Sequence, residues 1–320
     1  MSVTTRALLE EITLDALRPD EALIEIHATG ICHTEFSCMS GQLSRVGDKV
    51  KHVQKDDKVL LSFDPCGSCL QCDEGHPAYC NEWAQRNFGQ NSFARHTIVS
   101  SASIVKVSTD TRLDLFSPLG CGIQTGAGAI FNTLDVQEGK SVAIFGVGSV
   151  GMSAVMAAKL RNAKTIIAVD LQPQRLELAK KLGATHTVVG SDSDVVAQIQ
   201  KISGSNGVDY SVDCAGIPQV VEKALDCLGT RGKGTTVGAP TPGVRAGIDV
   251  FAHLVMGRQC LGCCEGDSNT QKFLPYLIEA HAQGRFPLEE IVTYYPVNEF
   301  EKAFKEVKEG KALKGVLLWN

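Results

Sequence analysis

Four cysteines within fifteen residues have the spacing of a metal site. Two residues separate Cys66 from Cys69, two separate Cys69 from Cys72, and seven separate Cys72 from Cys80. Four thiolates at such spacing can surround one Zn²⁺ tetrahedrally and fill its coordination shell. A filled shell leaves no position for water or a substrate, so we expect a structural zinc site. Disulfides and buried free thiols are the alternatives. The expected reducing compartment disfavours disulfides, and the spacing disfavours free thiols.

Two more cysteines stand in distinctive local sequences. Cys32 belongs to GICHTE at 30–35, and Cys121 belongs to LGCGIQTG at 119–126. Cys121 falls where a β-rich part of the chain meets a part with alternating strands and helices, a junction at which ligands commonly bind. Taken alone, either cysteine is more typical of a packed core residue than of a ligand.

A glycine-rich turn at 146–151 follows an apolar run and precedes a stretch of helical character. Gly146 suits a tight strand-to-helix turn, Gly148 allows close approach of a pyrophosphate, and Gly151 lets the helix pack on the strand. Asp170 ends the next apolar run, nineteen residues after Gly151. A carboxylate there accepts hydrogen bonds from a ribose and repels a 2′-phosphate, which favours NAD over NADP. The alternative is a glycine-rich turn that binds no ligand.

The elements that must position these groups change character along the chain. The first 120 residues are β-rich, with alternating apolar residues at 21–27, 58–63 and 96–100. From Gly122 the pattern predicts a parallel sheet of α/β class, with strands at 141–146, 165–170, 185–190, 208–213 and 233–239 and helices at 150–162, 173–182, 193–203 and 217–228. In the last sixty residues we expect helices at 269–283 and 298–309, with Asn298 as N-cap and Gly310 ending the second, and strands at 291–296 and 315–319.

The bulk properties are those of a globular protein large enough for two domains. The chain has 320 residues, of which 43% are hydrophobic and 21% are charged. A net charge of −5 argues against a nucleic-acid or anionic-membrane partner, and no apolar run approaches the ~20 residues of a membrane span. Twelve cysteines without a secretory signal favour a cytoplasmic protein.

Together these segments resemble a known family. GICHTE at 30–35, CGSCLQCDEGHPAYC at 66–80, GCGIQTGAGA at 120–129 and GVGSVG at 146–151 are similar to motifs of the zinc-dependent medium-chain alcohol dehydrogenases, most closely those acting on aryl and primary alcohols. The resemblance implies a GroES-like β-barrel catalytic domain over 1–121, a Rossmann NAD-binding domain over 122–262, and a return to the catalytic domain over 263–320. It also implies a small alcohol or aldehyde substrate and a homodimer or homotetramer.

The resemblance also implies roles for single residues. Cys32 and Cys121 would hold a catalytic zinc together with a histidine between them, and Thr34 would relay the alcohol proton. Cofactor contacts would come from the glycine turn, from Asp170, and from four further residues, namely His33, Thr125, Arg175 and Lys314.

The chain departs from the family pattern upstream of the glycine turn. The Gly-His-Glu segment that supplies the third catalytic-zinc ligand is absent, and a second loop after Asn87 is shortened, so the chain carries internal deletions. His52 is the candidate substitute ligand, although its neighbours align with a later strand. The alternative function is therefore a catalytically impaired NAD-binding homologue that retains structural zinc alone. A second metal site at Cys260, Cys263 and Cys264 is less natural than an apolar strand, and a nucleic-acid-binding zinc protein is disfavoured by charge.

Overall fold

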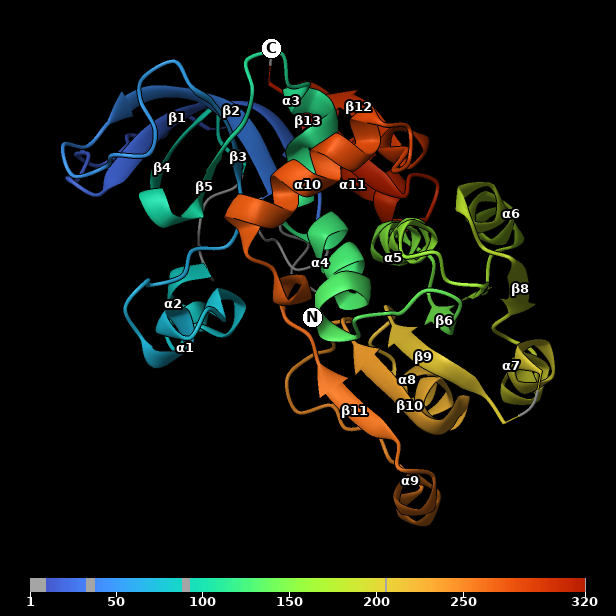
Figure 1. Ribbon diagram of the computed structural model, residues 1–320. Coiled ribbons are helices and arrows are strands. Elements are labelled where there is room, and N and C mark those ends of the chain that lie inside the picture. Colours follow the sequence, from blue (N-terminus) through green and yellow to red (C-terminus); the bar gives the residue numbers. More distant parts are fainter. Residues whose placement is uncertain (1–9, 33–37, 88–92, 205, 320) are drawn as a thin grey trace, which may run out of the picture.

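The computed structural model describes residues 10–32, 38–87, 93–204 and 206–319, which fold into two β-sheets with helices packed around them (Figure 1). The expected α/β class is confirmed, with a mostly antiparallel sheet beside a parallel one. None of the helices in these ranges is both long and apolar enough to cross a bilayer.

The first sheet joins the two ends of the chain. It runs in the order β12-β13-β1-β2-β3-β5, with β4 also pairing with β1. Its strands are β1 Glu21–Gly30, β2 Cys38–Val46, β3 Lys58–Leu61, β4 His96–Ser100, β5 Ile104–Lys106, β12 Val292–Pro296 and β13 Lys314–Leu318. β13 lies antiparallel to β1, with Gly30 opposite Val316. The C-terminal segment thus returns to the N-terminal sheet, as the family resemblance implies.

The second sheet is parallel throughout and runs in the order β11-β10-β9-β6-β7-β8. Its strands are β6 Ser141–Phe145, β7 Thr165–Asp170, β8 His186–Val189, β9 Val208–Asp213, β10 Leu228–Thr236 and β11 Gln259–Gly262. The strand order reverses direction between β6 and β9. Ligands of doubly wound sheets bind beyond the carboxyl ends of the strands at such a reversal.

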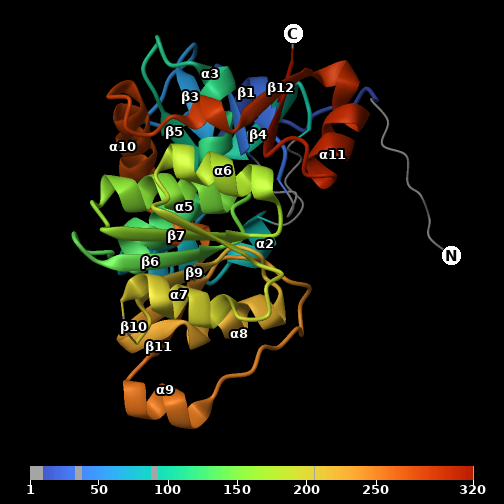
Figure 2. The same cartoon turned by 90° about the vertical axis from the view of Figure 1, so that its right-hand side faces the viewer.

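Helices cover both faces of the parallel sheet. Figure 2 shows α5 and α6 on the face turned toward the first sheet and α7 and α8 on the other face. The helices are α1 Leu70–Asp73, α2 Trp83–Asn87, α3 Leu113–Phe116, α4 Gly122–Gly128, α5 Ser149–Leu160, α6 Pro173–Leu182, α7 Val195–Ser203, α8 Pro218–Asp226, α9 Val250–Met256, α10 Thr270–Ala282 and α11 Phe300–Lys308.

Burial follows the periodicity of the sequence. Along β1 the side chains of Ala22, Ile24 and Ile26 are fully buried, whereas the residues between them are partly exposed. All seven residues of α4 are buried because this helix lies between the two sheets and packs on α5. A Cβ on Gly126 would lie 2.0 Å from the carbonyl oxygen of Val150, so this contact requires glycine.

Two differences from the predicted element boundaries have a structural cause. β10 begins at Leu228 instead of residue 233, because Arg231 adopts a φ of 60° and the pairing with β9 shifts register between Leu228 and Lys233. The predicted N-cap at Asn298 is wrong, since a 3₁₀ turn over Val297–Glu299 precedes α11 and Glu299 takes the cap position. The predicted end is confirmed, with Gly310 at a φ of 74°.

Candidate active site

The four cysteines of the 66–80 segment converge on one point. Their sulfur atoms all lie within 4.8 Å of one another, and within the described ranges no other group of three or more candidate ligands is this compact. Cys72 Sγ lies 3.6 Å from Cys69 Sγ and 4.0 Å from Cys66 Sγ. Tetrahedral zinc with bonds of about 2.3 Å places its sulfur ligands about 3.8 Å apart. The geometry therefore fits the expected zinc site.

Backbone amides surround these sulfurs. The Asn81 and Glu82 N–H groups donate to Cys69 Sγ and Cys80 Sγ at 3.5 and 3.4 Å, and Cys66 N–H donates to Cys80 Sγ at 3.2 Å. Bonds from the Asn81 and Cys72 amides lower the pKa of the Cys69 thiol to about 6. Donors that favour thiolates suit a cation at the centre of the cluster.

The cysteine lobe also touches the parallel sheet. The Tyr79 hydroxyl, from the 3₁₀ turn Pro77–Tyr79, donates to the Gly262 carbonyl at 3.2 Å. Gly262 ends β11, and the turn Glu265–Asp267 follows it. The lobe therefore supports the segment that leaves the sheet.

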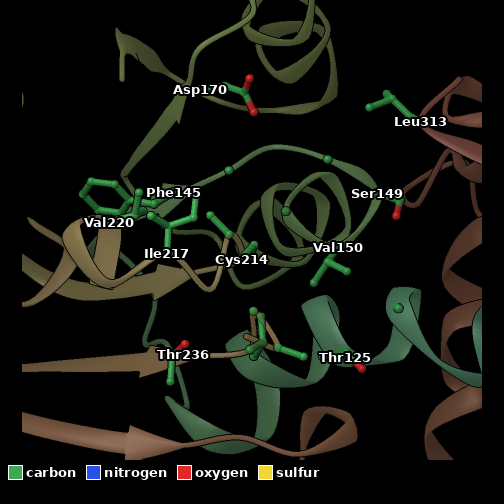
Figure 3. Close-up of a pocket in the computed structure, with 18 of the residues that line it drawn as sticks. Thr125, Phe145, Ser149, Val150, Asp170, Cys214, Ile217, Val220, Thr236 and Leu313 are labelled. Atoms are coloured by element: carbon green, nitrogen blue, oxygen red, sulfur yellow. The ribbon is translucent and has the colours of Figure 1, made fainter. Parts of the chain in front are cut away.

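A cavity of about 700 Å³ lies at the carboxyl ends of the parallel strands and extends to Cys32 and Cys121. In Figure 3, Asp170 lies on one side of the turn that leads into α5 and Thr125 lies on the other. This is the ligand position expected for the strand order of the sheet. One cavity thus contains both the dinucleotide motif and the two isolated cysteines.

The glycine turn has the geometry that each glycine was predicted to provide. Gly146 adopts a φ of 83°, and a Cβ on Gly151 would lie 2.1 Å from the Gly146 carbonyl oxygen. A Cβ on Gly148 would instead meet no protein atom within 4 Å. Gly148 caps α5 without a side-chain hydrogen bond, so first-turn N–H groups are available to an anion in the cavity.

Asp170 ends β7 beside this turn. Its Oδ2 accepts a 2.8 Å hydrogen bond from Val147 N–H, and its Oδ1 accepts one of 2.9 Å from Gln172 N–H. Arg175 Nη1 lies 3.8 Å from Asp170 Oδ2, and both side chains line the cavity. The carboxylate is thus fixed in position on the cavity wall, with a cation next to it.

Cys32 and Cys121 are 89 residues apart in sequence, yet their sulfur atoms lie 3.4 Å apart. Cys32 follows the end of β1, and Cys121 precedes α4. This pair fits two of the ligands of a metal ion facing the cavity. Among the described residues, no third histidine, cysteine or carboxylate ligand atom completes a compact group with them. His33 and Thr34 lie outside the described residues.

His52 is not part of this site. It is exposed in the segment between β2 and β3 and belongs to no candidate ligand group of the described ranges. The second metal site imagined at Cys260, Cys263 and Cys264 is likewise not formed there. Cys260 is exposed on β11, whereas Cys263 and Cys264 line the cavity with thiol pKa values that burial raises to about 12.

Lys314 and Thr125 lie on the cavity wall, as the predicted cofactor contacts require. The Lys314 side chain is 2% exposed, and its Nζ donates to the Ile31 carbonyl at 2.7 Å, next to Cys32. The Thr125 hydroxyl donates to the Cys121 carbonyl at 2.9 Å. Both residues thus lie close to the cysteine pair.

Glu265 is a site residue that the sequence reasoning missed. It is 9% exposed, lines the cavity, and follows β11 at the carboxyl edge of the sheet. Burial, and then the nearby Cys32, raise the pKa of its carboxyl group to about 7. The available signal was its place, since this acid follows by three residues a strand that ends at the ligand-binding edge.

Comparisons with known proteins agree with this geometry. Residues 18–109 match the alcohol dehydrogenase GroES-like domain, and residues 149–279 match the zinc-binding dehydrogenase family. Geraniol dehydrogenase of Castellaniella defragrans is 32% identical over 97% of this chain and 94% of its own length. That alignment runs over 351 positions, more than the 320 residues of this chain, so it contains gaps opposite segments of the relative, in agreement with internal deletions.

Two solved structures are similar over nearly the whole chain. Benzyl alcohol dehydrogenase from Acinetobacter calcoaceticus superposes with a TM-score of 0.94 at 36% identity, covering 96% of this chain and 94% of its own. An alcohol dehydrogenase zinc-binding domain protein from Burkholderia ambifaria superposes with a TM-score of 0.93 at 39% identity, covering 96% and 93%. From its motifs, its fold and these relatives, the chain belongs to the zinc-dependent medium-chain alcohol dehydrogenases, a family of oxidoreductases.

Proposed function

We propose that this chain is an NAD(H)-dependent enzyme that interconverts a primary alcohol, including aryl alcohols, and its aldehyde by hydride transfer. The observation that carries the proposal is the shared cavity, in which the glycine turn and Asp170 lie together with the Cys32–Cys121 pair. We assign residues 1–121 and 263–320 to the catalytic domain and residues 122–262 to the NAD-binding domain, a division that the membership of the two sheets supports.

The cofactor would lie across the carboxyl edge of the parallel sheet. Its pyrophosphate would accept hydrogen bonds from the first turn of α5, where Gly148 leaves room for it. The adenosine ribose would bond to Asp170, and the fixed carboxylate would repel the 2′-phosphate of NADP. Arg175 borders the same ribose position, and Lys314 would face the phosphates from the first sheet.

Two zinc sites would serve different purposes. The cysteines at 66–80 would hold a structural ion, because their geometry closes the coordination shell. Cys32 and Cys121 would hold an ion that, when bound, acts as a Lewis acid on the substrate oxygen. Thr34, which follows Cys32 by two residues, is the proposed relay for the alcohol proton.

The names of the relatives support the substrate class. Geraniol and benzyl alcohol, for which two of them are named, are both primary alcohols with an unsaturated carbon next to the carbinol. An alkoxide of this type gives a conjugated aldehyde on hydride loss. We therefore propose allylic and benzylic primary alcohols as the first substrates to test.

The deciding experiment combines turnover with metal analysis. Purified protein should form NADH from NAD⁺ and benzyl alcohol and should contain two zinc ions per chain. Cys32→Ala should lose turnover and one zinc, whereas Cys260→Ala, at an exposed position on β11, should keep both. One zinc per chain, bound NADH and no turnover would instead identify the impaired NAD-binding homologue.

We also propose that the chain forms a homodimer through the edge of the parallel sheet. β11 is the edge strand, and α9 next to it exposes Phe251, Leu254 and Val250 by 76%, 73% and 69% (Figure 1). An unpaired edge with an apolar neighbour is costly in water, and a second copy can pair with both. Light scattering should give twice the chain mass, and the double variant Phe251→Asp/Leu254→Asp should give a monomer. A monomeric wild-type chain would contradict the proposal.

A further inference from the structure

Glu265 is a buried acid for which the proposed reaction has no task so far. It lines the cavity together with Cys32, Cys121 and Thr125. It reaches this position because β11 ends at Gly262 and the chain then turns back against α4. A carboxyl group that is 9% exposed is costly to keep charged unless a cation offsets it.

The carboxyl group is held in place by two residues of α4. Gln124 Nε2 lies 3.2 Å from Oε2 of Glu265, and the Thr125 hydroxyl lies 3.4 Å from the same oxygen. The two segments are also in close backbone contact, since a Cβ on Gly128 would lie 2.1 Å from the Gly266 carbonyl oxygen. Because both contacts go to Oε2, the other oxygen, Oε1, is available to a group in the cavity.

The group that meets Glu265 follows from the direction of the cofactor. With the pyrophosphate at the glycine turn and the adenosine at Asp170, the other half of the dinucleotide must extend away from Asp170. Figure 3 shows Thr125 on that far side of the cavity. Glu265 lies against Thr125, so the nicotinamide half is the part of the cofactor that reaches it.

The charges at this end leave the carboxylate only partly balanced. A zinc ion at Cys32 and Cys121 would offset their two thiolates. The Lys314 ammonium lowers the pKa of Glu265, but this single charge would also face the two charges of the pyrophosphate. Cys263 and Cys264 stay neutral, because burial raises their thiol pKa values to about 12. The oxidised nicotinamide ring carries one positive charge, whereas the reduced ring is neutral.

We propose that the Glu265 carboxylate lies against the nicotinamide ring and stabilises its cationic form, so that it raises the affinity of this chain for NAD⁺ relative to NADH. This inference depends on the proposed NAD(H)-dependent function. Its consequence is that Glu265 favours alcohol oxidation, because the oxidised cofactor is held and the reduced cofactor is released more readily.

The test measures the dissociation constants of both cofactors on the zinc-loaded protein, NADH by its fluorescence and NAD⁺ by calorimetry, at about pH 8. Glu265→Gln removes the charge and keeps an oxygen that can accept the bond of Gln124 and remain in contact with the Thr125 hydroxyl. The matched control is Glu138→Gln, which removes one charge from an exposed position in the loop before β6. Glu265→Asp keeps the charge at the site.

We expect the ratio of the NAD⁺ to the NADH dissociation constant to rise about tenfold in Glu265→Gln, equivalent to ~1.4 kcal/mol. Glu138→Gln and Glu265→Asp should keep the wild-type ratio. A change below about threefold, or an equal weakening of both cofactors, overturns the inference and leaves Glu265 as a support for α4. If neither cofactor binds even to wild type and Glu138→Gln, the proposed function itself has failed. Matching melting temperatures would establish that Glu265→Gln is folded. If it is not, a Glu265→Asp ratio that differs from wild type by more than about threefold overturns the inference, because this variant keeps the charge.

Discussion

The cysteine lobe should depend on its metal for its structure. Of the fifteen residues from Cys66 to Cys80, Ala78 and Cys80 are the ones that are buried, and α1 has no buried residue. Burial of an alanine contributes about 1 kcal/mol or less. Ordering fifteen residues costs about 1 kcal/mol each or more. Zinc binding of about 10–16 kcal/mol is of the size needed to offset that cost.

Cys72→Ser is the sharpest test of this dependence, because Cys72 Sγ lies close to two other ligands, at 3.6 and 4.0 Å. Removing one of four ligands should weaken zinc binding by roughly a quarter, about 3 kcal/mol, or about a hundredfold in affinity. Competition with a chromogenic chelator measures this loss. Limited proteolysis with mass spectrometry should then find cleavage between residues 66 and 80.

Ser68→Ala is the matched control within the lobe. Its hydroxyl lies 3.8 Å from Cys66 Sγ, while the N–H bond to that sulfur comes from the backbone and is kept. Zinc affinity should change less than about threefold. The reasoning is refuted if Cys72→Ser keeps wild-type zinc affinity and a protease-resistant lobe, because burial or other contacts would then be holding these residues.

Three further predictions concern the cofactor edge, the contact between α4 and the turn after β11, and pH. Asp170→Ser should weaken NADH binding about tenfold or more and narrow the preference over NADPH, measured by fluorescence titration, because it removes the fixed ribose acceptor. Gly128→Ala should lower the free energy of unfolding by about 2 kcal/mol or more in urea, since its Cβ would lie 2.1 Å from the Gly266 carbonyl oxygen. Asp209→Asn should lower it by about 1 kcal/mol near pH 7. Burial raises the pKa of Asp209, but hydrogen bonds from Ser141 and Lys140 outweigh burial and lower the pKa overall. The charged carboxylate therefore stabilises the fold above the ordinary carboxyl pKa. This stabilisation is lost as the pH falls through the lower pKa of the folded state.

Each of these has a result that would contradict it. Equal affinity of Asp170→Ser and wild type for NADH would remove Asp170 from the cofactor site. Gly139→Ala is the reference for Gly128→Ala. A Cβ at Gly139 would meet no atom within 4 Å, but φ is 77°, so this variant measures the cost of left-handed backbone alone. Gly128→Ala must lower the free energy of unfolding by more than Gly139→Ala does. An effect of Asp209→Asn that is unchanged at about pH 3 would show that charge is not its source.

The periodic part of the fold was predictable because local sequence decides it. The apolar runs at 165–170 and 208–213 became β7 and β9 with the predicted ends, and the Gly146 turn took the left-handed φ that glycine allows. The start of β10 was not predictable, because Arg231 in a left-handed conformation creates an irregularity that no periodicity announces.

The site was predictable in its metal lobe and only partly elsewhere. Cysteine spacing is a local property, so Cys66 to Cys80 could be grouped from sequence alone. Cys32 and Cys121 are 89 positions apart in the sequence. They come together because β1 pairs with the rest of its sheet and α4 packs against neighbouring elements, contacts that no local pattern reveals. Their joint use followed from family resemblance. The place of Glu265 after a strand that ends at the ligand-binding edge was a signal for it, but its contacts with Gln124 and Thr125 come from the fold alone.

The backbone at Glu265 gives a further reason to assign it a function. Glu265, Gly266 and Asp267 adopt φ values of 48°, 69° and 48°, so two residues with a Cβ occupy left-handed backbone next to a glycine that occupies it freely. A non-glycine residue there costs about 1 kcal/mol or more relative to glycine. Asp267 gains a 2.6 Å hydrogen bond from Thr133 Oγ1, whereas Glu265 places a buried carboxyl group beside Cys32. Backbone strain and the burial of its charge both disfavour a glutamate at this position, and a cationic ligand beside the carboxylate would reverse the second of these costs.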